Sequence, residues 1–323
     1  MPIVRQPTRA GVRDAAAKVA RILSATPLLV HEVRGVQVAF KAESLQPIGA
    51  FKIRGAYNKI AKLPEAERAR GVVAHSSGNH AQAVAYAAKA FGISATIVIP
   101  ETAPAMKIAA TRAYGATVVL VPAADRVRVA AELAERDGLV SVPPFDDIDV
   151  IAGQGTVGLE VAADLPDLEL ILVPMSGAGL LSGIAVAIKA SCPSARVVGV
   201  QPELAAHGRE SLRAGRPVTW SPDRTIQTTA DALRVGMFGA ATWEHVHALV
   251  DDIVTVTEDE IAEAVRALAF SGRLVAEPGG AVAVAAILAG AVEVSGPTVA
   301  VLSGGNVDPE LYARLLAKAP AQN

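Results

Sequence analysis

The stretch QPIGAFKIRGA, residues 46–56, places Lys52 among residues that do not suit an ordinary surface lysine. A proline and a glycine interrupt regular structure just before it, and bulky apolar residues flank the lysine on both sides. Burial, together with the like charge of Arg54, would lower the pKa of Lys52. A neutral amine near pH 7 is what a Schiff base with an aldehyde cofactor requires. The same pattern also fits an amphipathic helix start whose lysine reaches water.

Composition restricts the classes of protein and partner. With 323 residues, 51% of them hydrophobic but only 4% aromatic, the chain predicts about two lobes around a large aliphatic core. Thirty basic and 32 acidic residues leave a net charge of −2, which gives no electrostatic basis for binding nucleic acid or an anionic membrane. We therefore expect a small-molecule partner.

Targeting and redox signals are weak. The single cysteine, Cys192, excludes an internal disulfide and is expected to be structural. The N-terminus lacks the apolar segment of a secretion signal, and no charge-free run reaches the ~18 residues of a membrane helix. A cytoplasmic protein with no membrane partner is the expectation.

Strand and helix patterns alternate along most of the chain. Apolar runs typical of buried strands lie at 36–40, 71–74, 95–99, 117–121, 170–173, 197–200 and 298–302. Helical periodicity lies at 14–23, 52–63, 81–91, 105–114, 127–136, 157–163, 180–190, 258–271 and 281–290. This alternation predicts an α/β protein with open, mostly parallel sheets flanked by helices. Residues 201–250 are less regular and are expected to form long loops around a cleft.

Three glycine-containing turns follow predicted strands. SGAGL, residues 176–180, precedes a helix, so its backbone amides and the helix dipole suit a phosphate group. SSGNH, residues 76–80, clusters hydroxyl, amide and imidazole groups, and SGGN, residues 303–306, adds another hydroxyl. Each turn alone could be an ordinary helix cap or tight junction. Because ligands bind beyond the carboxyl ends of parallel strands, we expect the turns and Lys52 to converge.

Five ordered motifs resemble the fold-type II pyridoxal-phosphate (PLP) enzymes, and within them the threonine/serine dehydratase and serine racemase group. The motifs are QPIGAFKIRGA, SSGNHAQA, IAGQGTVGLE, SGAGL and SGGN. The resemblance implies a tryptophan synthase β-like fold, with two open twisted sheets and the cofactor between a larger and a smaller lobe. The larger, cofactor-binding domain would comprise residues 1–70 and 146–323, and the smaller, substrate-binding domain residues 71–145.

The resemblance also implies roles for individual residues. Lys52 would bind PLP covalently and later remove the Cα proton of the substrate, Asn79 would bond the ring hydroxyl, and Ser303 would face the pyridine nitrogen. The cofactor-binding residues implied are Lys52, Phe51, Asn79, Ser176, Gly177, Ala178, Gly179, Leu180 and Ser303. A serine has too high a pKa to keep the pyridine nitrogen charged as a carboxylate would, so electron withdrawal by the ring is moderate and suits β-elimination.

The implied reaction is dehydration and deamination of a 3-hydroxy amino acid, L-threonine or L-serine, to a 2-oxo acid and ammonia. Lys52 and Ser77 would be catalytic, and the substrate would contact Ser76, Ser77, Asn79 and His80. The alternative on the same cofactor is a serine racemase, because Ser77 resembles the serine that protonates the opposite face of Cα in racemases. A non-catalytic small-molecule-binding module is a third reading, which the unusual lysine disfavours. A homodimer and a catabolic role are further expectations from the resemblance and the chain length.

Three departures from the family pattern affect these expectations. Ser176 and Ala178 replace two glycines of the phosphate loop. Gln201 and His207 stand where cation-binding members carry carboxylates, so we predict no activating metal there and expect His207 to be a solvated loop residue. Ala232 stands where a glycine is common, and its methyl group is expected to narrow the substrate pocket.

Overall fold

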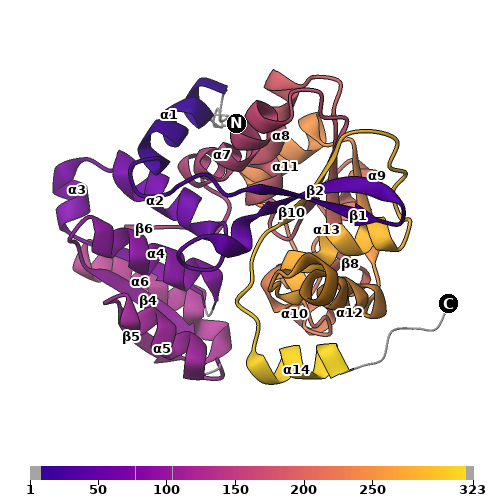
Figure 1. Cartoon of the computed structure of the whole chain (residues 1–323). Helices are drawn as coiled ribbons and strands as arrows, with labels where there is room; N and C mark the ends of the chain where they lie inside the picture. The colour runs from indigo at the N-terminus through magenta and orange to yellow at the C-terminus, as the bar shows by residue number, and fades with distance from the viewer. Residues whose placement is uncertain (1–8, 77, 104, 318–323) are drawn as a thin grey trace.

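Two β-sheets organise the chain (Figure 1), in a computed structural model that describes residues 9–76, 78–103 and 105–317. The strands are β1 (Leu28–Val33), β2 (Val36–Ala42), β3 (Val72–His75), β4 (Ala95–Pro100), β5 (Thr117–Val121), β6 (Val140–Ser141), β7 (Leu170–Pro174), β8 (Arg196–Pro202), β9 (Asp252–Val256) and β10 (Thr298–Leu302). A six-stranded sheet has the order β1-β2-β10-β7-β8-β9, and a four-stranded sheet the order β5-β4-β3-β6. All pairs are parallel except β1 with β2. The predicted fold class is confirmed.

Helices cover both faces of each sheet. The main α-helices are α1 (Arg9–Val19), α2 (Lys52–Lys62), α3 (Glu65–Ala69), α4 (Asn79–Ala90), α5 (Ala105–Ala113), α6 (Arg126–Asp137), α7 (Ile148–Asp164), α8 (Gly179–Ser191), α9 (His207–Ala214), α10 (Pro222–Thr225), α11 (Ala240–Leu249), α12 (Glu258–Ala267), α13 (Pro278–Leu288) and α14 (Pro309–Ala317). Short 3-10 turns η1 (Glu43–Leu45) and η4 (Asp231–Leu233) also bear on the site. No helix within the described ranges has the length and apolarity that crossing a membrane would require.

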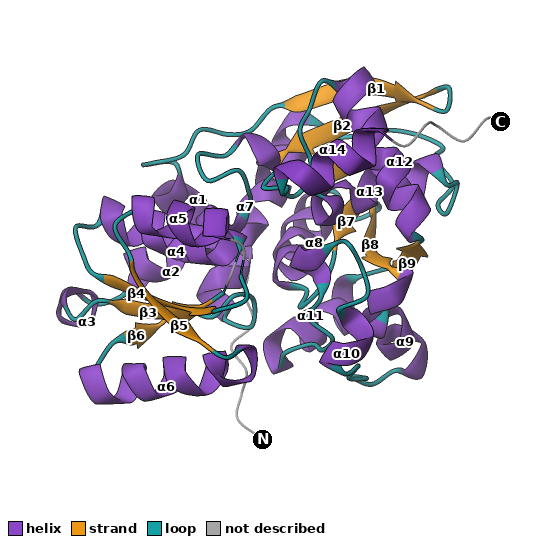
Figure 2. Ribbon diagram, turned by 90° about the horizontal axis from the view of Figure 1, so that it is seen from below, coloured by secondary structure: helices purple, strands orange, loops and turns teal. Residues whose placement is uncertain are grey.

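Figure 2 shows helices on the two faces of each sheet, and apolar clusters fill the core between these helices and the sheets. On the larger sheet, α12 and α13 pack on one face, and α7, α8 and α11 on the other. On the smaller sheet, α2, α4 and α5 pack on one face and α6 on the other. Val19 of α1 and Ile53 of α2 lie in the same cluster as residues of β3 and β4, so segments before residue 71 pack against the smaller sheet. The domain boundary near residue 70 stays a prediction.

Helix α7, which contains the IAGQGTVGLE motif, packs against both α2 and α8. A Cβ atom on Gly153 would lie 2.6 Å from the Cα of Gly55, and one on Gly183 would lie 2.5 Å from the backbone nitrogen of Gly155. Only glycines allow such close backbone approach. Because α2 begins at Lys52 and α8 begins at the SGAGL turn, α7 fixes the distance between the lysine and the phosphate loop.

The structure corrects several predicted elements. The helix expected at 157–163 is the second half of α7, and the expected long loops at 201–250 contain α9, α10 and α11. Strand β1 was not anticipated because it is a half-exposed edge strand with polar residues in its sequence, LLVHEV. Strand β9 was not predicted either. The start of helix α11 depends largely on a distant residue, because the carboxylate of Asp146, far away in sequence, accepts hydrogen bonds from its first backbone amides.

Candidate active site

Lys52 is the first residue of α2, and its amine is directed by a neighbouring loop. Nζ donates a hydrogen bond of 2.6 Å to the carbonyl oxygen of Pro144 and lies 5.2 Å from the centre of the Phe51 ring. Burial lowers the pKa of Lys52 to about 8. The predicted direction is confirmed, but the predicted contribution of Arg54 is not, because acidic partners neutralise that guanidinium.

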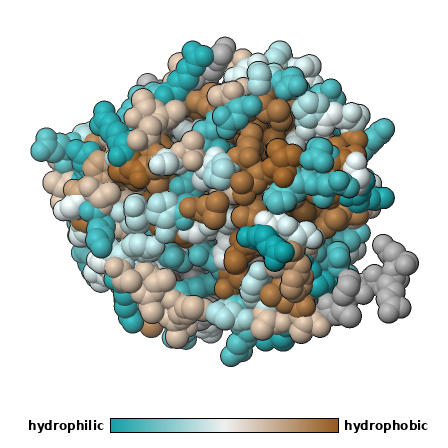
Figure 3. Space-filling view, viewed as in Figure 1, coloured by the Kyte–Doolittle hydropathy of each residue, from teal (hydrophilic) through white to brown (hydrophobic). Residues whose placement is uncertain are grey.

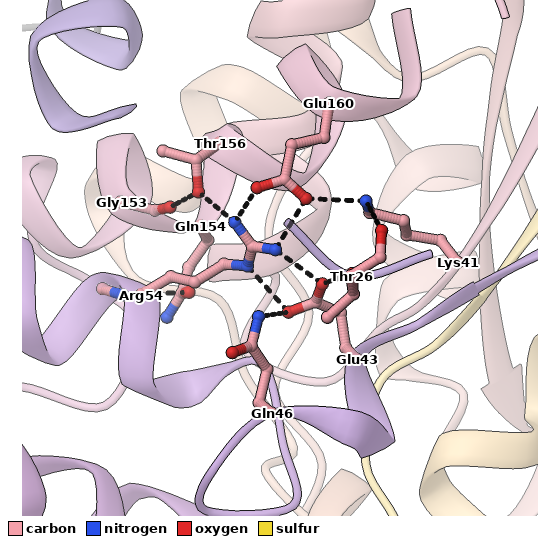
Figure 4. A network of polar contacts seen from close by, with 10 residues as sticks. Thr26, Lys41, Glu43, Gln46, Arg54, Gly153, Gln154, Thr156 and Glu160 are labelled. Carbon is pink, nitrogen blue, oxygen red and sulfur yellow. Dashed lines mark hydrogen bonds and ion pairs between the residues drawn. The ribbon is translucent and has the colours of Figure 1, made fainter. Parts of the chain in front are cut away.

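Arg54, two residues after Lys52, anchors α2 through a network of polar contacts (Figure 4). Its guanidinium donates to both carboxylate oxygens of Glu43, to both of Glu160 and to the hydroxyl of Thr156, so all five N–H groups are used. Lys41 of β2 adds a second cation, 2.6 Å from Glu160. Burial opposes the charge of Arg54, but Glu43 and Glu160 outweigh it and raise the pKa. Two cations and two carboxylates thus hold α2 against α7, β2 and η1.

The SGGN turn pairs directly with the segment that precedes Lys52. The backbone N–H of Phe51 donates to the carbonyl of Ser303 at 3.1 Å, and that of Gly305 donates to the carbonyl of Gly49 at 2.9 Å. Ser303 itself is buried at the end of β10. The motifs around Lys52 and Ser303, about 250 residues apart in the printed sequence, are therefore neighbours. This agrees with the prediction that the glycine turns and Lys52 lie together.

The phosphate loop presents unpaired backbone donors. Helix α8 begins at Gly179, and Ala178 before it adopts a left-handed conformation with a φ of 69°. In the described part of the chain, no protein acceptor is hydrogen-bonded to the backbone N–H groups of Gly177, Ala178, Gly179 or Leu180. Unpaired amides at a helix N-terminus fit a phosphate group. The hydroxyl of Ser176 is bonded to the backbone of Val235 instead, so its side chain braces the loop.

Phe145 explains why glycines occupy two positions of this loop. A Cβ atom on Gly177 would lie 2.5 Å from the Phe145 ring, and one on Gly179 would lie 3.0 Å from its Cα. Phe145 therefore lies directly against the phosphate loop.

The segment that contains Phe145 was missed as part of the site. Its neighbour Pro144 binds Lys52, Asp146 caps α11, and Asp147 caps α7 through the backbone amides of that helix. The signal available in the sequence was a carboxylate at N-cap spacing before a helical pattern.

The N-terminus of α4 forms the side of the site next to Ser76. Within the described residues, no acceptor is bonded to the backbone N–H groups of Asn79 and His80, the first two residues of this helix. The hydroxyl of Ser76 accepts from the N–H of Gly78 at 3.2 Å. Ser77, predicted to be catalytic and substrate-binding, lies outside the described residues. Two free amides at a helix start suit a carboxylate.

The imidazole of His80 is buried and neutral. Its Nε2 lies 2.8 Å from the carbonyl oxygen of Val142, and because a carbonyl only accepts, Nε2 carries the proton. Nδ1 is then an acceptor, and it has no hydrogen-bond partner among the residues that the structure describes. Burial, with a contribution from the charge of Lys52, lowers the pKa of His80 to about 3. This side chain has no donor left for a substrate.

Glu277, which was not among the predicted site residues, forms a hydrogen bond with Asn79. Glu277 lies immediately before α13 and is 3% exposed. Its Oε1 accepts from Nδ2 of Asn79 at 2.6 Å, and Oδ1 of Asn79 accepts from Asn306 at 2.8 Å. Burial and the charge of Asp231 raise the pKa of Glu277 to about 7, against the opposing effects of Asn79 and Lys107. The available signal was a lone carboxylate in the apolar stretch AEPGGAVAVAA.

A cavity of about 280 Å³ adjoins this cluster. Glu277 and Asn306 line it together with Lys107, Asp231 and others. Lys107 and Asp231 form an ion pair between α5 and η4, so the two sheets' flanking elements meet at its rim.

Gln201 and His207 form a hydrogen-bonded unit with a nearby backbone turn. Nε2 of Gln201 donates to the carbonyl of Ala205 at 2.9 Å and lies 3.2 Å from Nδ1 of His207. The expectation of a solvated His207 is wrong: the residue is fully buried at the start of α9 beside Phe238, and burial lowers its pKa to about 4. In the described ranges, no group of three or more His, Cys, Asp or Glu side chains could hold a metal ion.

Comparisons with known proteins agree with this geometry. The family described as "Pyridoxal-phosphate dependent enzyme" matches residues 20–304. The chain belongs to this family. PLP is accordingly its cofactor, and Lys52 with the unpaired amides of the phosphate loop fits the aldehyde and the phosphate of that group.

Individual proteins similar to this PLP enzyme include ammonia-lyases and a serine racemase. It is 46% identical to an L-threonine ammonia-lyase of Thermotoga maritima over 293 residues, covering 90% of this chain and 72% of the relative. It is 40% identical to an L-threo-3-hydroxyaspartate ammonia-lyase of Saccharomyces cerevisiae, covering 96% and 97% of the two chains. The structure of maize serine racemase superposes with a TM-score of 0.90 at 37% identity, covering 96% and 97% of the two chains.

Proposed function

We propose that this PLP enzyme is an ammonia-lyase that converts a 3-hydroxy amino acid, L-threonine or L-serine, to a 2-oxo acid and ammonia. The observation that carries the proposal is the half-buried amine of Lys52, with its lowered pKa, at a site that also contains the phosphate loop and the Ser303 turn. The ammonia-lyase relatives at 40% and 46% identity support the same reaction class.

Lys52 is the group that moves the Cα proton. PLP, when bound, supplies an electron sink for the charge that develops at Cα. A general base works best when its pKa lies near the working pH, and a pKa of about 8 meets this requirement far better than the ordinary value of 10.5. The carbonyl of Pro144 accepts a hydrogen bond from the same amine and limits the directions in which it points.

The substrate carboxylate is assigned to the start of α4. The N–H groups of Asn79 and His80 have no acceptor within the described ranges, and with the positive end of the helix dipole they favour an anion there. The hydroxyls of Ser76 and Ser77 are nearby in sequence. The His80 imidazole offers only an acceptor, so its part in binding the carboxylate is its backbone amide.

Ser303 favours elimination among the reactions available to PLP. A serine hydroxyl beside the pyridine nitrogen does not keep that nitrogen charged, so Cα charge is better released at once with the β-hydroxyl than stored in the ring. The buried position of Ser303, tied to Phe51 by a backbone hydrogen bond, supports this assignment.

The second candidate is an amino-acid racemase. Its support is the similarity to maize serine racemase and the presence of Ser77, the proposed proton donor to the second face of Cα. Loss of Cα deuterium from labelled L-serine without 2-oxo acid would favour it.

We also propose that the enzyme is a cytoplasmic homodimer with the lobes 1–70 plus 146–323 and 71–145. The support for a dimer is a band of hydrophobic side chains on the face of the molecule seen in Figure 3. Large apolar side chains that are more than half exposed include Val30, Leu45, Phe270 and Val275. Light scattering tests the proposed dimer, and a monomeric mass at micromolar concentration would contradict it.

The experiment for the reaction is a coupled assay of 2-oxo acid and ammonia on L-threonine and L-serine, with chiral analysis of the remaining substrate. We expect oxo acid from the wild type and none from Lys52→Ala. No oxo acid but accumulating D-isomer would establish the racemase. If neither product forms although the protein shows the visible absorbance of bound PLP, the proposed substrates are wrong. The cofactor chemistry would then still stand.

A further inference from the structure

Glu277 and Asn306 both form hydrogen bonds with the side-chain amide of Asn79. The amide of an asparagine has an acceptor end and a donor end, and its hydrogen-bond partners decide which end points where. Asn306 donates to Oδ1 of Asn79, and the other hydrogen on the same Asn306 nitrogen goes to the carbonyl of Ile48 at 2.7 Å. Glu277 accepts from Nδ2 of Asn79 at 2.6 Å. The other Nδ2 hydrogen has no acceptor in the described part of the chain and is available to a ligand.

The side chain of Glu277 bonds Asn79 and does not cap the helix that follows it. It occupies the N-cap position of α13, yet its side chain makes no capping hydrogen bond. Its own N–H is bonded to the carbonyl of Gly304 at 3.1 Å. A Cβ atom on Gly304 would lie 2.5 Å from the carboxylate oxygen and 3.2 Å from Nδ2 of Asn79. The absence of a side chain at Gly304 thus makes room for the Glu277–Asn79 bond.

A buried carboxylate next to a neutral amide is costly. No lysine or arginine in the described ranges forms an ion pair with Glu277, although its environment includes the Lys107–Asp231 pair. A buried acid without a cation destabilises the fold, so its presence here points to a role other than stability. The neighbouring loop carries Ser303, which the proposed function places at the cofactor ring, so the Asn79 amide faces the same region.

We propose that Glu277, supported by Asn306, is a positioning residue that fixes the amide of Asn79 so that its free N–H points to the oxygen substituent of the PLP ring. Glu277 acts only through Asn79, and the inference rests on the PLP site of the proposed function. Only an acceptor at position 277 keeps Nδ2 of Asn79 turned that way. If the acceptor is removed, the amide can rotate and the cofactor loses a donor.

The test is a double-mutant cycle on cofactor affinity, measured without substrate. Apoenzyme is titrated with PLP and the visible absorbance of the lysine adduct is recorded for wild type, Glu277→Ala, Asn79→Ala and the double variant. We expect each single variant to raise the Kd about tenfold and the double variant to be no weaker than Asn79→Ala, because the two side chains act as one unit. Additive effects, or an unchanged Kd in Glu277→Ala, would overturn the proposal.

Glu277→Gln is the matched variant, because its carbonyl oxygen still accepts from Asn79. We expect the Kd of Glu277→Gln for PLP to stay within about twofold of wild type and the pH midpoint of its absorbance band to stay unchanged. Glu277→Ala should shift both quantities. Equal losses in both variants would contradict positioning through an acceptor. Urea unfolding of each apoprotein separates these effects from misfolding. Absence of any band in wild type would instead refute the proposed function.

Discussion

At the scale of the residue, the chemistry depends on the proton affinity of Lys52. A lysine with the ordinary pKa of 10.5 is neutral in about one molecule in 3,000 at pH 7, whereas one with a pKa of about 8 is neutral in about one in ten. The cause is burial, and among the described residues no carboxylate forms an ion pair with this amine. Its charged form therefore has no counter-charge in that part of the chain, which favours the reactive neutral amine.

The first prediction is the pH dependence of PLP incorporation. Because only the neutral amine attacks the aldehyde, we expect the rate for apoenzyme to rise about tenfold per unit below pH ~7 and to level off above pH ~8. Stopped-flow absorbance measures the rate. A rate that keeps rising to pH ~10 would show an unshifted lysine and contradict the assignment; free N-acetyl-lysine, with an ordinary amine, is the control.

The second prediction concerns metals. The amide of Gln201 donates to the carbonyl of Ala205, and its oxygen already accepts from the backbone N–H groups of Gly208 and Arg209. An imidazole such as that of His207 is not a preferred ligand of hard cations. We expect magnesium or calcium at millimolar concentration to leave Tm and activity unchanged. A melting shift with magnesium that disappeared in Gln201→Ala would contradict this. Chelator-treated wild type is the control.

At the scale of the element, the site is a set of helix starts held at fixed distances. Helices α2, α4 and α8 begin with Lys52, Asn79 and Gly179, and α7 packs between the first and the last through its glycines. Helix starts concentrate free N–H groups, which explains why both the carboxylate and the phosphate are assigned to such positions.

The third prediction compares two changes in one loop. In Gly177→Ala the new methyl group would lie 2.5 Å from the Phe145 ring, so the loop must shift, and we expect the Kd for PLP to rise about tenfold or more, about 1.4 kcal/mol. Ala178→Gly should instead relieve the cost of an L-residue at a φ of 69° and stabilise the protein by up to about 1 kcal/mol. Absorbance titration and urea unfolding measure the two effects. Weaker PLP binding in Ala178→Gly than in Gly177→Ala would contradict this account.

At the scale of the whole molecule, the buried network of Arg54 joins segments from three parts of the chain. Glu43 precedes α2, Thr156 and Glu160 lie in α7, and Lys41 is in β2. Such a network carries a large desolvation cost, so it is stable only as a complete unit.

The fourth prediction tests this dependence. Arg54→Met would leave Glu43 buried without its main cation, and we expect a loss of about 3–5 kcal/mol in the free energy of unfolding. Arg128→Ala is the control, because the ion pairs of that arginine with Asp125 and Glu132 are exposed, so the change should leave the urea midpoint unchanged. Equal midpoints for the two variants would show that the network contributes no stability.

The sequence by itself determined the α/β class, the order of the five motifs and the choice of Lys52, because strand and helix periodicity and glycine turns are local patterns. The tertiary structure decided what each polar group touches. The carbonyl of Pro144 at Lys52, the carboxylate of Glu277 at Asn79 and the burial of His207 all involve segments distant in sequence or packed beneath others. Burial and partner choice set pKa values and side-chain orientation, and both depend on long-range packing, for which a single sequence has no local signal.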